Sequence, residues 1–213
     1  RAVLAVEPAK LPAVQTRVSG LEAAFRAEHA VSDPGLTLTV RSGNPAPAAL
    51  TEAAGKTVVQ FLQLVPNGIV SMSMDIPGLV QTSSNLGIFH VADGLLVARA
   101  SVRSSVASEK EMLLERFATL CALLGASMEI TGDYPAWEYK RDSALRDTMV
   151  RVFTEQYGHA PKIEAIHAGL ECGLFCGKIP GLDAVSFGPN LYDIHTTAER
   201  MSISSVQRVY AYL

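Results

Sequence analysis

The sequence predicts a mixed α/β protein: an α+β layer over residues 1–133, then a segment of an α/β domain over residues 134–213. The layer is predicted by two strand-like runs that meet at Asp93-Gly94, a dipeptide typical of tight hairpin turns, and by the helical patterns around them. From residue 134 the order becomes helix, strand, turn, strand and helix, which is typical of one edge of a larger α/β sheet.

Periodicity and turn residues delimit the elements before the hairpin. The run "RAVLAVEP" (1–8) and the alternating "LTLTV" (36–40) are predicted to be strands, and residues 8–30 a helix. A second helix enters through the prolines after residue 44 and stops at the Pro-Asn-Gly stretch of residues 66–68. Helices of this layer are expected on one face of an antiparallel sheet.

The hairpin strands are expected within residues 80–106, and a helix follows them. Ser108 and Glu111 match a capping box at its start, because the serine can accept from a free amide while the glutamate reaches back. Gly125 is expected to end this helix. Cys121 falls among its apolar positions and is predicted to lie in the core. The run "SMEITGDY" then returns as a strand.

The second part is predicted to place two loops at strand ends. Residues 142–158 form a capped helix, "KIEAIHAG" and "DAVSFGP" are strands, and the last helix begins near Ser202. Loops at strand ends of α/β sheets are where ligands bind. Two segments lie there, "HAGLECG" and "GPNLYDIHTTAE".

Composition excludes several classes of partner. A formal net charge of -3 and a pI near 6.0 provide no basic field for nucleic acid, and the apolar runs are too short to cross a bilayer. Three cysteines without framework spacing indicate a reducing, cytoplasmic setting. The chain opens without a methionine or a leader and ends inside an apolar helical pattern, so we expect a piece of a longer protein.

The segment "IHAGLECGLF" (166–175) gathers reactive groups among glycines. His167, Glu171, Cys172 and Cys176 could suggest zinc, but a Cys-x-x-x-Cys without a second pair does not supply four closed ligands. A Cys–His nucleophile pair is disfavoured because such partners are normally distant in sequence. We therefore interpret the cysteines as buried thiols of a glycine turn. Glu171 differs, because a carboxylate on a turn with close approach can hold a cation.

Three further residues have ordinary explanations when taken alone. His195 stands on a loop after an apolar strand, where a lone histidine is usually a solvated or hydrogen-bonded surface residue. Arg103 alternates with small apolar residues and reads as a surface arginine, and Asn85 reads as a turn former.

Four motifs in order, "DYPAWEY", "IHAGLECGLF", "VSFGP" and "IHTTAER", resemble the C-terminal half of the aminoacyl-histidine dipeptidases. These are bacterial Xaa-His, carnosine-hydrolysing enzymes of a di-zinc metallopeptidase clan. The resemblance is specific over residues 134–199 and looser back to the N-terminus. It implies that residues 1–133 are most of an inserted lid and that residues 134–213 are the returning segment of the catalytic domain.

The resemblance also implies site residues and a cofactor. His195 matches the last ligand of two zinc ions, or of other divalent metals, while Asn85 and Arg103 match lid positions that contact a dipeptide. A bidentate guanidinium suits the substrate carboxylate. The remaining ligands and the general base lie upstream of Arg1 in that family, so no catalytic residue is expected in this chain and the isolated piece is expected to be inactive. A homodimer through the lid is compatible with this architecture.

Two alternatives stay open from the sequence. A related metal-dependent amidohydrolase or aminoacylase would keep the chemistry and change the substrate. A stand-alone α+β binding or dimerisation module would have no activity. For Glu171 two roles are weighed equally: receiving the ammonium group of a dipeptide, or holding its loop by hydrogen bonds to nearby amides.

The register of the hairpin tests the joint assignment of Asn85 and Arg103. Regular pairing outward from a two-residue turn places the two side chains on opposite faces of the sheet. Both can line one pocket only if an extra residue shifts the register, and Gly87 suits such a bulge. We therefore predict an interruption between residues 83 and 87, with Arg103 on the face that meets the catalytic segment or a partner subunit.

Overall fold

The computed structural model describes residues 2–43, 48–92, 94–165 and 170–213. The chain divides into two compact units, Arg1–Lys56 and Thr57–Leu213. The lid boundary expected near residue 133 is a different division, and it stays a prediction.

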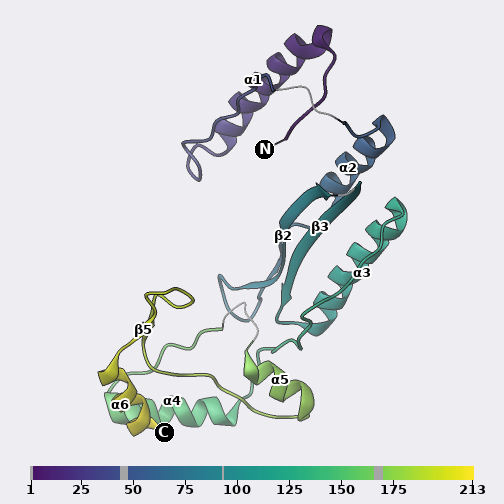
Figure 1. Cartoon of the computed structure of the whole chain (residues 1–213). Coiled ribbons are helices and arrows are strands. Elements are labelled where there is room, and N and C mark those ends of the chain that lie inside the picture. Colours follow the sequence, from purple (N-terminus) through teal and green to yellow (C-terminus); the bar gives the residue numbers. More distant parts are fainter. Residues whose placement is uncertain (1, 44–47, 93, 166–169) are drawn as a thin grey trace. The chain divides into compact units, whose positions relative to one another are not determined.

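The first unit is mainly one helix. After a 3-10 turn at Pro8–Lys10, α1 (Leu11–Glu28) begins with a proline in its first turn, where the missing N–H would have had no helical partner (Figure 1). The strands predicted at residues 1–8 and 36–40 are wrong, because described residues 2–7 and 36–40 form none. Alternating apolar and polar residues give a segment one apolar face. A strand also requires a neighbouring strand to which it can form hydrogen bonds.

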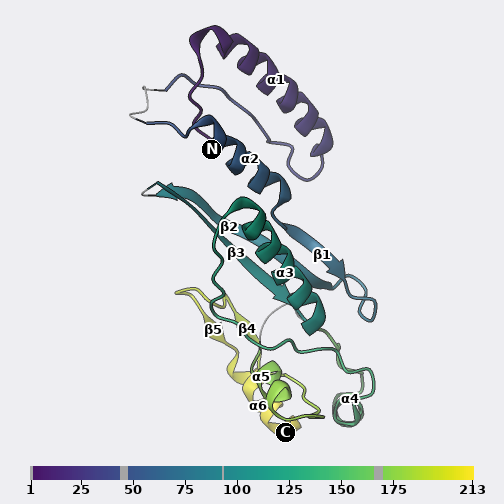
Figure 2. The same ribbon diagram turned by 90° about the vertical axis from the view of Figure 1, so that its right-hand side faces the viewer.

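The second unit contains a three-stranded antiparallel sheet of order β1-β2-β3. Its strands are β1 (Gly68–Met72), which the sequence analysis did not predict, β2 (Val80–Ala92) and β3 (Leu95–Ser104). The helix α3 (Ala107–Leu124) runs along the sheet (Figure 2). Leu113 and Leu120 of α3 are buried, and so are Thr82 and Ser84 of β2. The predicted packing of a helix on an antiparallel sheet is confirmed.

The helix α2 (Glu52–Leu64) reaches the same sheet. Phe61 stacks on Phe89 of β2, with ring centroids 5.7 Å apart. Phe89 pairs with Ala98, and residues 98 and 104 lie an even number of positions apart on β3. Phe89 therefore shares the face that carries Ser104 and α3.

The start of α3 differs from the expected capping box. Val106 is the N-cap and no side chain caps the helix, so Ser108 lies within the first turn. The helix ends at Gly125, which has a φ of 66°, as predicted. Cys121 is only half-buried. The strand predicted from residue 127 is not formed.

The remaining elements of the second unit are short. They are α4 (Ala144–Tyr157), α5 (Glu171–Lys178), β4 (Leu191–Tyr192), β5 (Arg200–Met201) and α6 (Ile203–Tyr212). Ser143 caps α4 by accepting from the N–H of Arg146, and Gly158 ends it at a φ of 75°, so the predicted capped helix is confirmed. The last helix starts after Ser202, as expected. Tyr212 donates to the carbonyl of Met149 at 2.7 Å and so ties α6 to α4.

Neither strand predicted in this region is formed by described residues. Residues 162–165 and 183–189 have no ladder partner within the described part of the chain, and residues 166–169 lie outside it. Apolar runs of this kind are typical of interior strands of parallel sheets, which are stabilised only between two neighbours.

A carboxylate links α3 to the sheet. Glu109 accepts hydrogen bonds from Ser71 at 2.5 Å, from Gln81 at 2.8 Å and from Thr82. These donors, Ser71 first and then Thr82, lower the pKa of Glu109 below its ordinary value against the opposing effect of burial. The ionised form is therefore the one that the fold prefers.

We expect the free energy of unfolding to fall as Glu109 is protonated. Because its folded pKa is below the unfolded value of about 4.3, its contribution is present above that pH and is lost as pH falls through the folded pKa. Denaturant titrations of wild type and Glu109→Gln at neutral pH and near pH 3 measure this contribution. Glu111→Gln, an exposed carboxylate of the same helix, is the control. Identical acid sensitivity in all three proteins would contradict the assignment.

Candidate active site

The β2–β3 ladder contains the interruption that the sequence predicts. Ala92 pairs with Leu95 across a two-residue connection, and the register shifts between Leu86 and Ile88. Gly87 is therefore the extra residue. Beyond Gly87, Asn85 pairs with Ser101 and Ser83 pairs with Arg103. In a regular hairpin without this bulge, Asn85 would pair with Val102.

The bulge places Asn85 and Arg103 on one face of the sheet. Paired residues share a face, and residues two apart on one strand share it too, so Ser101 connects the two positions. Thr82 and Ser104, whose hydroxyl oxygens are 2.8 Å apart, lie on the other face with α3. The predicted shift and shared face of Asn85 and Arg103 are confirmed. Both residues are exposed.

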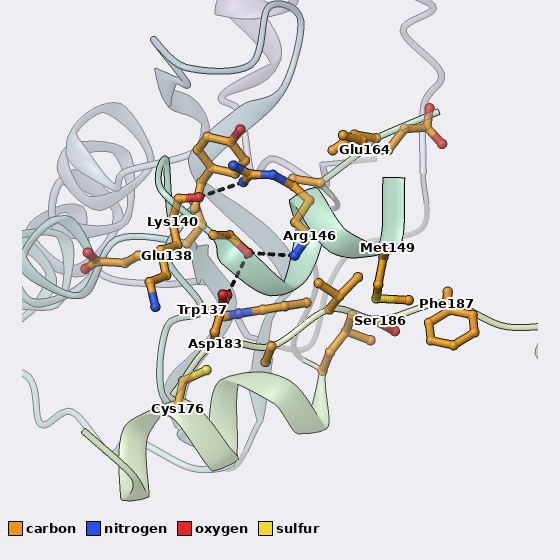
Figure 3. Close-up of a pocket in the computed structure, with 18 of the residues that line it drawn as sticks. Trp137, Glu138, Lys140, Arg146, Met149, Glu164, Cys176, Asp183, Ser186 and Phe187 are labelled. Carbon is orange, nitrogen blue, oxygen red and sulfur yellow. Dashed lines mark hydrogen bonds between the residues drawn. The ribbon is translucent and has the colours of Figure 1, made fainter. Parts of the chain in front are cut away.

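A cavity of about 1290 Å³ lies in the second unit beside the end of β3 (Figure 3). Arg103 lines it, together with the segment before α4, the inner side of α4 and residues 182–188. Its wall is mixed: Trp137 and Phe187 supply apolar surface, and Glu138 and Glu164 supply carboxylates. The structure brings Arg103 to this cavity, whereas Asn85, Glu171 and His195 do not line it.

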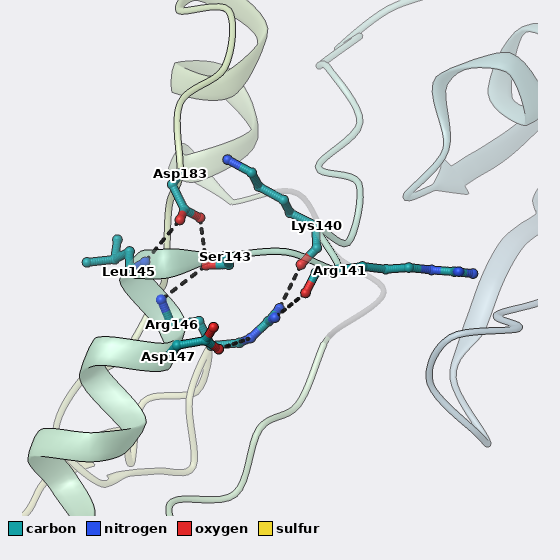
Figure 4. A network of polar contacts seen from close by, with 7 residues as sticks. All are labelled: Lys140, Arg141, Ser143, Leu145, Arg146, Asp147 and Asp183. Atoms are coloured by element: carbon teal, nitrogen blue, oxygen red, sulfur yellow. Dashed lines mark hydrogen bonds and ion pairs between the residues drawn. The ribbon is translucent and has the colours of Figure 1, made fainter.

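Asp183 fixes one wall of the cavity (Figure 4). Its carboxylate accepts from the Ser143 hydroxyl at 2.7 Å and from the Leu145 N–H at 3.1 Å, and these two bonds lower the pKa of Asp183. Arg146 donates to the carbonyls of Lys140, at 2.7 Å, and Arg141. Asp183 thus holds the start of α4, a role that the sequence analysis missed.

The segment "LECGLFCGK" is a helix and not a glycine turn. Cys172 and Cys176 both lie on α5 and are half-buried, and Gly173 is buried. Burial raises the pKa of Cys172, and its electrostatic interactions with the neighbouring Cys176 and Glu171 raise it further. A thiol held in its neutral form is a poor nucleophile, in agreement with the interpretation of this cysteine as structural.

The glycines of α5 allow it to approach its own chain. A Cβ at Gly177 would lie 3.1 Å from Cβ and Cγ of Pro135, and one at Gly173 would lie 3.2 Å from the Pro135 carbonyl and from Trp137. Because these glycines have no side chain, the Pro135–Trp137 stretch of the motif "DYPAWEY" can pack directly against the backbone of α5. This packing brings the two motifs into contact.

Gly173→Ala is expected to lower the free energy of unfolding by about 1–3 kcal/mol, as overpacking does in other cores, because Gly173 is buried and its added Cβ would meet the Pro135 carbonyl. Gly55→Ala is the matched control, because nothing lies within 4 Å of a Cβ at that position of α2. There the alanine should stabilise by about 0.5–1 kcal/mol through helix propensity. Chemical denaturation compares them, and two changes of the same sign would contradict close packing at α5.

Glu171 is the first residue of α5 and is exposed. A carboxylate there interacts favourably with the positive end of the helix dipole, which supports the local, structural role. His167 lies outside the described residues. Within the ranges that the structure describes, no three His, Cys, Asp or Glu side chains gather as a metal site.

His195 lies in the loop between β4 and β5, with a φ of 65° and an exposed side chain. The described residues provide no hydrogen bond to its ring, although its backbone N–H donates to Glu199 at 3.0 Å. A zinc site needs further nitrogen, sulfur or oxygen ligands beside one imidazole. His195 therefore fits one ligand position, and the described residues offer no companions for it.

Comparison with known proteins relates the whole chain to dipeptidases. The cytosol non-specific dipeptidase of Escherichia coli (strain K12) is 30% identical over 212 residues, which are 100% of this chain and 44% of that protein. The crystal structure of an aminoacylhistidine dipeptidase from Vibrio alginolyticus matches with a TM-score of 0.83 and 28% identity, over 94% of this chain and 42% of that one. The resemblance to the aminoacyl-histidine dipeptidase family is confirmed.

The match to this crystal structure also confirms the mixed α/β fold class. The chain spans less than half the length of the dipeptidases it matches. No family-wide sequence pattern matches it. Among the described residues, none of the helices combines the length and the apolar character needed to span a membrane.

Proposed function

We propose that the chain is the lid and the C-terminal catalytic segment of a cytosolic, zinc-dependent dipeptidase that hydrolyses Xaa-His dipeptides. The observation that carries the proposal is the bulge at Gly87, which places Asn85 on the same face of the sheet as Arg103, the residue that lines the cavity. The names of the two relatives support a dipeptide as substrate and, for the Escherichia coli protein, the cytosol.

Each proposed site residue has a defined task. Arg103 would bind the carboxylate of the dipeptide through two parallel N–H donors, and Asn85 would add an amide contact from the same face. His195 would hold zinc, which when bound activates water and polarises the scissile carbonyl. Glu171 would receive the substrate ammonium group or stabilise the start of α5, and its place at the helix terminus favours the second role.

The second candidate is a dipeptidase that accepts many side chains. It is favoured by the Escherichia coli relative, which is named as a non-specific dipeptidase. The confirmed relation to dipeptidases disfavours a stand-alone binding module. A homodimer through the lid remains part of the proposal and is compatible with either specificity.

A panel of dipeptides distinguishes the two candidates. We expect the zinc-loaded full-length protein to show the highest kcat/KM for Xaa-His substrates such as carnosine, while the isolated 213-residue chain turns over none of them. Equal kcat/KM for histidine and non-histidine dipeptides would favour the broad enzyme. Hydrolysis of N-acylated amino acids in place of dipeptides would contradict both and favour an aminoacylase.

A further inference from the structure

The backbone of the β4–β5 hairpin is unusual at two non-glycine residues. Asp193 and His195 have φ values of 50° and 65°, the left-handed region that disfavours residues with a Cβ. Such conformations persist where surrounding contacts over-determine them, and they cluster at functional sites. The question is which contacts hold His195 in this conformation.

Asp193 is held by bonds within the hairpin itself. Its carbonyl accepts from the Thr196 N–H at 3.2 Å and from the Thr196 hydroxyl at 2.7 Å. Its carboxylate pairs with Arg200, whose guanidinium lies 5.2 Å from the ring centroid of Tyr192. Tyr192 and Arg200 also form a pair of the two-stranded ladder. Figure 2 shows the two strands of this ladder, β4 and β5. The entry to the loop is therefore fixed by its own residues.

His195 depends on one side chain. Its N–H donates to Oε2 of Glu199 at 3.0 Å, a hydrogen bond to a charged acceptor across four residues. The backbone N–H of Glu199 in turn donates to the Thr196 carbonyl at 3.2 Å, which fixes the residue that carries the carboxylate. A charge-assisted bond of this kind is comparable in strength to the cost of a left-handed residue with a Cβ.

The hydrogen bond to Glu199 involves only the backbone of His195, so the imidazole ring can bind another partner. No hydrogen bond from the described residues reaches the ring of His195, while its backbone is bound. Resting on the proposed role of His195, we propose that Glu199 is a positioning residue: its carboxylate holds the His195 backbone in the left-handed conformation that presents the imidazole to zinc. Glu199 acts through the backbone and does not itself bind the metal or the substrate.

Zinc affinity of the full-length protein tests this role. Loss of an outer partner of a metal ligand typically weakens affinity about 10–100-fold, and we expect an increase of that size in the zinc Kd for Glu199→Ala, measured by chelator competition. Glu199→Gln keeps an acceptor oxygen and should restore an affinity close to wild type. Glu155→Ala, an exposed carboxylate paired with Arg151 on α4, controls for the loss of one negative charge.

Amide hydrogen exchange of the metal-free protein gives a readout independent of zinc. The N–H of His195 should exchange faster in Glu199→Ala than in wild type or Glu199→Gln, with unchanged thermal unfolding. Wild-type zinc affinity in Glu199→Ala, alongside lost affinity in His195→Ala, would overturn the positioning role alone. Wild-type zinc affinity in His195→Ala would overturn the metal role of His195, and the positioning role with it.

Discussion

His195→Ala in the full-length protein is expected to abolish dipeptide hydrolysis and to reduce the amount of bound zinc. The physical reason is the loss of the proposed imidazole ligand, because neither the alanine nor a nearby described side chain can replace it. The side chain is exposed and its ring has no hydrogen bond within the described residues, so thermal unfolding should be unchanged. Turnover and elemental metal analysis measure the two effects.

His29→Ala is the control for this substitution. His29 is an exposed histidine just after α1, and its Nδ1 lies 3.3 Å from the Ser32 hydroxyl oxygen. It should retain full activity and zinc. Near wild-type hydrolysis in His195→Ala would show that His195 is not a ligand, whatever the metal content of the control.

Arg103→Ala is expected to raise the KM for dipeptides about 10–100-fold, the range for losing a hydrogen bond to a charged group. Dipeptide amides, which lack the carboxylate, should show a much smaller change. Arg103→Lys should recover part of the loss, since an ammonium group keeps the charge but not the bidentate geometry. Steady-state kinetics on matched acid and amide substrates separate these effects.

Arg99 provides the matched control on the same strand. Arg99 and Arg103 are four residues apart on β3 and share a face, yet only Arg103 lines the cavity. Arg99→Ala should therefore leave the KM for dipeptides unchanged. Equal losses in the two variants, or equal losses on acid and amide substrates, would refute carboxylate binding by Arg103.

Local chemistry made the hairpin predictable from the sequence. Asp93-Gly94 sets the position of the connection, strict alternation sets the register outward from it, and Gly87 tolerates the extra residue. The same holds for α4, where the capping serine and the terminal glycine act within one turn of the helix. In these elements the determining contacts lie within the element itself.

Longer-range contacts account for the elements that were predicted wrongly. The runs at residues 183–189 and 36–40 have the composition of strands, but a strand forms only where a neighbouring strand offers its N–H and C=O groups. Glycines in "LECGLFCGK" suggested a turn, whereas helix packing against Pro135 explains them. That contact joins residues about 40 positions apart, and a pattern of neighbouring residues cannot predict a contact over such a distance.

Polar networks were the least predictable part of the site. Asp183 binds the start of α4 across 40 residues, and Glu109 of α3 binds the sheet, whereas the expected capping box does not form. Both carboxylates are ordinary in the sequence, and their roles depend on which hydroxyl groups the fold brings to them. His195 differs because its role rests on the resemblance, and the geometry adds the left-handed backbone and the bond to Glu199.

The central claim is that this chain belongs to a zinc-dependent dipeptidase, and zinc titration of the stripped full-length protein tests it most directly. Hydrolysis of carnosine should be absent after chelation and should return in proportion to bound zinc until the sites are filled. Undiminished carnosine hydrolysis by protein from which all metal has been removed, or no dipeptide hydrolysis at full zinc occupancy, would contradict the account.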